Sequence, residues 1–82
     1  MVLNLYFSNL SLSERYTYIS DFGKYIGVRY YYNHAINLHL DGETFYEVWY
    51  FIPDNKIEKI EPLDDIKKLD LYIKHMNELA KI

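Results

Sequence analysis

An Asp-Gly dipeptide at residues 41–42 separates two segments that carry the alternating side chains of β-strands. Asp-Gly between alternating apolar segments is a strong short-range signal for a β-hairpin, because Gly tolerates the backbone angles of the tight turn. Before the dipeptide, Ile36, Leu38 and Leu40 alternate with polar residues. After it, residues 43–52 read as a long strand that is apolar on both faces. The centre of the chain is therefore predicted to form an antiparallel sheet.

Further strands are predicted on both sides of this hairpin. Residues 25–33 are rich in Tyr, Val and Ile, which suit a pleated surface, and Asn33-His34 is a plausible turn. The Pro-Asp-Asn-Lys stretch at residues 53–56 predicts another turn, and residues 57–61 a short last strand. We expect an antiparallel meander of three or four strands.

A first helix is indicated before the strands. Ser11 and Glu14 have the spacing of a capping box, in which each side chain accepts a hydrogen bond from the other residue's backbone N–H. Apolar residues then recur at helical spacing until Gly23, a natural stop for a helix. These signals predict a helix over residues 12–22. The alternation in residues 1–9 is too short to assign to strand, helix or loop.

A second helix is predicted over residues 64–80. Asp64 is expected as its N-cap, and Asp65 adds negative charge to the first turn, where the helix dipole favours it. Asp64 and Lys68 form an acid-before-base pair four residues apart. The segment also carries one apolar stripe at spacings of three and four, formed by Ile66, Leu69, Tyr72, Ile73, Met76, Leu79 and Ala80.

These elements predict a single α+β domain over residues 1–82, with both helices on one face of the sheet. Half of the residues are hydrophobic and 18% are aromatic, which supplies a core to a short chain. The chain has no Cys, which secreted domains of this size usually need, so we expect a cytoplasmic protein. We expect no signal peptide and no membrane helix, because no basic start or long apolar run occurs.

The faces of the predicted sheet depend on register. Pairing Leu40 near Thr44 would place Ile36 and Leu38 on the face of Tyr46, beneath the helices; a one-residue shift would exchange the faces. The other face then collects aromatic side chains studded with polar ones. The candidate site residues on it are Arg29, Tyr31, His39, Phe45, Glu47, Trp49 and Phe51.

Three interpretations of this aromatic face stay open: an ordinary structural face, a homodimer interface, or a surface for another macromolecule. Trp, Tyr and Arg are enriched at binding hot spots, and exposed aromatic patches rimmed with charge mark interaction sites. The leading hypothesis is a non-enzymatic protein-interaction module, of adaptor, immunity or inhibitor type, that binds a protein partner or a second copy of itself. The alternative is a single-stranded nucleic-acid or small-molecule binder using the same aromatics.

Other chemistry finds little support in the residues. A net charge of −3 with mixed signs gives no reason to expect nucleic acid. His39 and Glu47 could be diagonal neighbours and form an acid–base couple, but nothing nearby organises a nucleophile. Capping explains the carboxylates at residues 64–65, and no glycine-rich phosphate loop occurs. We therefore expect no catalytic residue, no metal and no cofactor.

Short segments along nearly the whole chain resemble a group of short uncharacterised proteins from Bacteroidota-type bacteria. The resemblance implies a bacterial cytoplasmic origin and a stand-alone domain. The motifs are structural and the group has no assigned activity, so the resemblance implies no functional residue. The segments are Asn4-Leu5-Tyr6, Leu12-Ser13-Glu14-Arg15, Tyr30-Tyr31-Tyr32, Ile36-Asn37-Leu38, Phe45-Tyr46-Glu47-Val48-Trp49-Tyr50, Asn55-Lys56-Ile57-Glu58-Lys59-Ile60 and Leu69-Asp70-Leu71-Tyr72.

Overall fold

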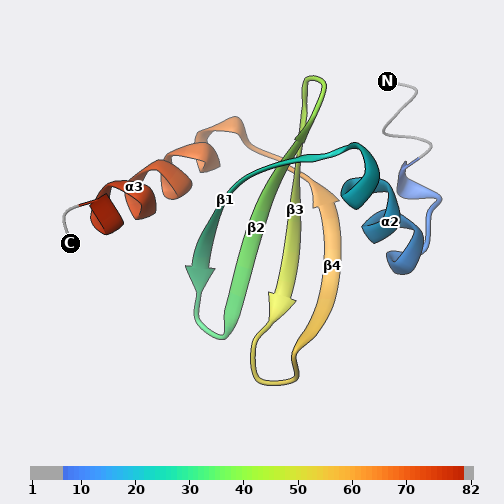
Figure 1. Ribbon diagram of the computed structural model, residues 1–82, viewed down its shortest axis with the longest axis horizontal. Helices are drawn as coiled ribbons and strands as arrows, with labels where there is room; N and C mark the ends of the chain where they lie inside the picture. Colours follow the sequence, from blue (N-terminus) through green and yellow to red (C-terminus); the bar gives the residue numbers. More distant parts are fainter. Residues whose placement is uncertain (1–6, 81–82) are drawn as a thin grey trace.

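The computed structural model describes residues 7–80, with side chains for residues 7–75. Its α+β class and its helix–meander–helix order confirm the prediction, while most of the segment left unassigned at residues 1–9 lies outside the described residues. The strands form one antiparallel sheet in the order β1-β2-β3-β4. The elements in chain order are α2 (Leu12–Phe22), β1 (Lys24–Tyr31), β2 (His34–Asp41), β3 (Thr44–Phe51), β4 (Lys56–Pro62), the 3₁₀ turn η1 (Ile66–Lys68) and α3 (Leu69–Ala80) (Figure 1).

Helix α2 begins and ends where its local signals predict. The Ser11 hydroxyl accepts the backbone N–H of Glu14 at 3.1 Å, and the Glu14 carboxylate accepts the backbone N–H of Ser11 at 2.8 Å. At the other end, Gly23 donates its N–H to the Ile19 carbonyl at 2.8 Å. A Cβ atom at Gly23 would lie 2.7 Å from that carbonyl oxygen. The φ of Gly23, −86°, is one that any residue adopts. Glycine is therefore required at this position by the lack of space for a side chain and not by the backbone angle.

The central hairpin has a different register from the predicted one. Gly42, with φ of +60°, occupies the first central position of a two-residue turn, as a type II′ turn requires. Asp41 therefore pairs with Thr44, and Leu40 pairs with Phe45. The face assignment in the sequence analysis rested on pairing Leu40 near Thr44. The difference is a single residue, and it turns every side chain of β2 to the other face of the sheet relative to β3.

The two helices lie on opposite faces of the sheet, so the prediction that both cover one face is wrong. Both faces of β3 are apolar, and each therefore needs its own cover. The α2 face, as we name it, has a core of Phe7, Ile19, Tyr46, Val48 and Ile60. The α3 face has a core of Ile36, Leu38 and Tyr72, with Phe45, Trp49 and Leu69 packed against it.

Helix α3 starts later than predicted. Asp65, and not Asp64, caps the segment, because its carboxylate accepts the backbone N–H of Lys67 at 3.0 Å at the start of η1. Asp64 instead forms the predicted ion pair with Lys68, at 2.8 Å. From there α3 runs outward past β1, while α2 lies at the β4 side of the sheet (Figure 1). A space is left between β1 and α3, and the candidate site lies along it.

Candidate functional site

The register decides which predicted site residues share a face. Strand partners lie on the same face, and the pairing puts six of the seven candidates on the α3 face: Arg29, Tyr31, Phe45, Glu47, Trp49 and Phe51. His39 pairs with Tyr46 and lies on the α2 face. The acid–base couple of His39 and Glu47, which the sequence analysis raised as a possibility without support, does not form, because the sheet separates the two side chains.

We predicted that this face is open, but α3 covers part of it and buries three of the six side chains wholly or partly: Arg29, Phe45 and Glu47. Arg29 and Glu47 are only 9% and 5% exposed, and Phe45 packs against the α3-face core. One carboxylate oxygen of Glu47 accepts two hydrogen bonds from Arg29, from Nε at 3.3 Å and Nη2 at 3.1 Å. The same oxygen accepts the hydroxyl of Tyr72, from α3, at 2.6 Å.

This ionic tie of Arg29, Glu47 and Tyr72 holds α3 against the sheet. Burial, and next the hydrogen bond to the Glu47 carboxylate, raise the pKa of Tyr72 far above its ordinary value, so the phenol stays a donor. A buried charge is tolerated when it is paired and its remaining hydrogen-bonding capacity is used. Arg29 also lies over the rings of Trp49 and Tyr72, at 5.6 and 5.5 Å from the centroids.

Trp49 is the centre of the uncovered part of the α3 face. Lys59 lies over its ring, with Nζ 4.2 Å from the centroid. The rings of His34 and Tyr31 meet it edge-on at 5.5 and 6.3 Å. With these contacts on its ring, Trp49 is half-buried. A rigid aromatic side chain of this kind is a suitable anchor for a partner.

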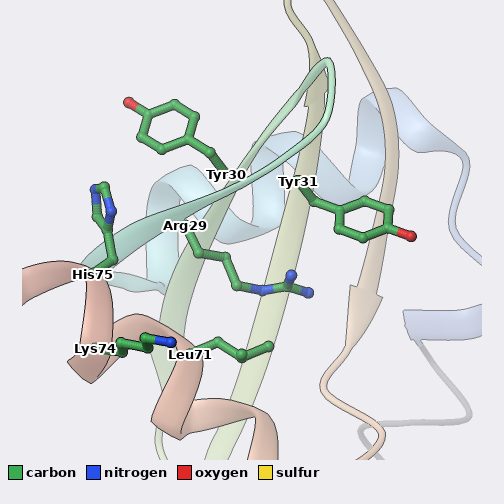
Figure 2. Close-up of a pocket in the computed structure, with 6 residues that line it drawn as sticks. All are labelled: Arg29, Tyr30, Tyr31, Leu71, Lys74 and His75. Carbon is green, nitrogen blue, oxygen red and sulfur yellow. The ribbon is translucent and has the colours of Figure 1, made fainter.

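A groove runs between β1 and α3, next to Trp49. Its larger hollow, of about 590 Å³, is lined by Arg29, Tyr30, Tyr31, Leu71, Lys74 and His75 (Figure 2). A second hollow of about 280 Å³ adjoins it and is lined by Arg29, Tyr31, Trp49, Lys68 and Leu71. The two share Arg29, Tyr31 and Leu71, so they form one continuous surface, which we call the β1–α3 groove.

The β1–α3 groove is basic and aromatic. Among its lining residues, Arg29, Lys68 and Lys74 carry positive charge, and none is an Asp or a Glu. This composition contrasts with the whole chain, whose net charge is −3. Two of the cations already have carboxylate partners, since Arg29 pairs with Glu47 and Lys68 with Asp64. The groove can therefore receive a modest amount of negative charge.

Half of the residues that line this groove come from η1 and α3, a segment that the sequence analysis treated only as a cover for the sheet. Lys68, Leu71 and His75 are spaced by three and four residues and so lie along one side of the helical segment. That spacing was visible in the sequence. This row of residues lies beside the stripe of Leu69 and Tyr72, which packs against the sheet. The sequence does not show that the neighbouring row faces the groove; the position of α3 beside β1 does.

Among the side chains that the structure describes, those of residues 7–75, no cluster of three or more His, Asp or Glu is placed to hold a metal ion. None of the helices within residues 7–80 is long and apolar enough to cross a membrane. The resemblance to the Bacteroidota-type group stays a prediction. Comparisons with known protein families, with curated proteins and with solved structures found no match to this chain.

Proposed function

We propose that this protein is a non-enzymatic interaction module that binds an acidic, extended segment of a partner protein in the β1–α3 groove. The observation that carries the proposal is the lining of the groove, which holds aromatic and basic side chains and no carboxylate. The positive charge of such a surface speeds the association of a negatively charged partner. Its aromatic side chains offer apolar area that the partner can bury.

The position of the groove favours a peptide over a nucleic acid. β1 is an edge strand of the described sheet, so one side of its backbone has no strand partner. Extended peptides bind proteins by lying along such edges. A nucleic acid would need several cations to neutralise its phosphates. Arg29 and Lys68 are already paired with carboxylates, and the chain is acidic overall.

Trp49 provides the test, because it is the single Trp of the chain and lies in the groove. The probe is an octapeptide of alternating Glu and Phe, which does not fluoresce at Trp wavelengths. We expect it to shift the emission of Trp49 and to bind more weakly as salt rises. The same peptide with Lys in place of Glu is the control, and equal binding of both peptides would refute the proposal.

Two charge-reversing variants locate the site. Lys74→Glu changes the lining of the groove and should weaken the Glu-Phe peptide by about 5-fold or more, the size of one lost charge pair. Lys67→Glu is the matched control, since Lys67 precedes α3 but lines neither hollow. Tighter binding of oligothymidylate than of the peptide would make the protein a nucleic-acid binder instead. A dimer that Lys74→Glu dissociates, measured by light scattering, would make a second copy the occupant.

A further inference from the structure

A separate hollow of about 260 Å³ lies on the α2 face, between α2 and the sheet. It lies on the opposite face of the sheet from the β1–α3 groove. Side chains from α2 and from all four strands line it: Tyr16, Ile19, Ser20, Tyr25, Asn37, His39, Val48, Tyr50 and Ile57. Its volume falls just below the usual range for ligand sites, so an occupant would be about the size of one ring.

No charged side chain lines this α2-face hollow, although charged residues make up 26% of the chain. His39 is the one lining group that could gain charge near neutral pH. Burial lowers the pKa of His39, which keeps its ring neutral at pH 7. A phosphate, a carboxylate or an ammonium group would find no counter-charge here and would lose its hydration. The hollow therefore selects an uncharged molecule.

The floor of the hollow has hydrogen-bonding groups that the protein does not use. Asn37 and His39 lie two residues apart on β2, so both point to the α2 face. Neither forms a side-chain hydrogen bond with the groups of residues 7–75. Nδ1 of His39 is buried without a partner and is shielded from the hollow as well as from water, so an occupant can reach only the Nε2 side of the ring. An unsatisfied acceptor is less costly to bury than an unsatisfied N–H, which favours the tautomer with its proton on Nε2.

The walls of the hollow are aromatic. Tyr16, Tyr25 and Tyr50 surround the two polar side chains, and the Tyr25 ring meets the His39 ring edge-on at 5.5 Å. Ile19 and Val48 close the apolar side toward the core. Flat aromatic walls favour a flat ligand, while the amide of Asn37 offers a donor and an acceptor side by side.

We propose that the α2-face hollow binds a small, uncharged, planar heterocycle that carries an amide-like edge, such as a free pyrimidine base. The ring packs among the tyrosines, and its N–H and C=O groups pair with Asn37 and His39. A nucleotide would gain nothing from its phosphate, because no cation in the lining can receive it. This site is independent of the proposed peptide groove, and either could exist without the other.

The test is a titration of the ¹⁵N-labelled full chain followed by amide chemical shifts, with uracil as the probe. We expect shifts confined to α2 and to the parts of the four strands that line the hollow, around Tyr25, His39, Tyr50 and Ile57, with a Kd of about 1 mM or tighter, as suits a ligand of this size. Benzene lacks the hydrogen-bonding groups of uracil, and benzoate carries a charge that the lining cannot neutralise. Each should bind at least about 10-fold more weakly than uracil.

Asn37→Leu should abolish the uracil shifts, and Asn37→Asp, which keeps the shape but adds charge, should weaken binding by about 10-fold or more. Lys74→Glu, in the other groove, is the matched control and should leave uracil binding unchanged. The comparison of ligands on the wild-type protein stands even if Asn37→Leu does not fold. Equal binding of benzene, tighter binding of uridine monophosphate, shifts that map to the β1–α3 groove, or no shifts at about 5 mM uracil would each overturn the proposal.

Discussion

The two faces of this sheet solve the same packing problem with different chemistry. The α3 face buries an ionic tie of Arg29, Glu47 and Tyr72 and opens into a basic, aromatic groove. The α2 face buries Phe7, Ile19, Tyr46, Val48 and Ile60 and encloses an uncharged hollow. The comparison teaches that burial alone does not decide what a face can bind. The charges retained on one face, and their absence on the other, make the two surfaces suited to different partners.

The largest expected effect on the difference between the two faces comes from removing the Glu47 carboxylate, which binds Arg29 and Tyr72 on the α3 face. Glu47→Ala leaves Arg29 buried and without its partner, which should cost about 3–5 kcal/mol of unfolding free energy. Urea unfolding measures the loss. The triple variant Arg29→Met, Glu47→Leu, Tyr72→Phe removes both charges and the hydroxyl that Glu47 accepts, and it should recover most of the loss. A loss below about 1 kcal/mol in Glu47→Ala would show that the tie adds little to holding α3.

A matched pair of core substitutions compares the faces directly. Ile36 on the α3 face and Ile60 on the α2 face are both 0% exposed. Either residue changed to Ala should destabilise the fold by about 2–5 kcal/mol, from lost burial and the cavity left behind. Because the sheet lies between them, the losses measured by urea unfolding should add within about 0.5 kcal/mol in the double variant. A larger departure from additivity would mean that the two cores are coupled through the sheet.

The cap of α2 gives a smaller effect that is restricted to one face. Ser11→Ala removes the acceptor for the Glu14 backbone N–H and should cost about 1 kcal/mol. Hydrogen exchange should show lost protection in the first turn of α2 and none in α3. Ser13→Ala is the control, since that side chain caps nothing in the described helix. Equal loss of protection in both helices would contradict a local role for the cap.

The smallest expected effect is a dependence on pH that belongs to the α2 face. Burial lowers the pKa of His39 below its ordinary 6.5, so between these two values the unfolded chain binds a proton that the folded chain does not. Stability should therefore be complete above pH 6.5 and fall as the pH drops through that value. Urea midpoints at about pH 7.5 and 5.5 should differ less in His39→Asn than in the wild type. An unchanged difference would mean that His39 titrates alike in both states.

Local signals made much of the fold predictable. The capping box at Ser11 and Glu14 and the stop at Gly23 predict the bounds of α2 correctly, because capping depends on contacts within one turn. The strands lie within one or two residues of their predicted bounds, because alternation and turn residues are also local signals. Asp65 took the capping role expected of Asp64, an error of one residue at a helix end.

The faces and the site were harder to predict because they depend on contacts between distant segments. A single turn residue, Gly42, shifts the register by one position and moves His39 away from the other site candidates. The burial of Arg29 and Glu47 depends on Tyr72, which is distant in the sequence. The groove itself needs the direction of α3 past β1, which no local pattern determines.

The separation of the two cores by a single sheet also has a consequence for how such a chain can change over time. Substitutions on one face meet few neighbours from the other, so their effects should combine almost independently. One surface can then change while the opposite surface keeps its packing. The two cores are separated by the paired strands β2 and β3. This separation, and not the size of the protein, decides how independently the two surfaces can change in so short a sequence.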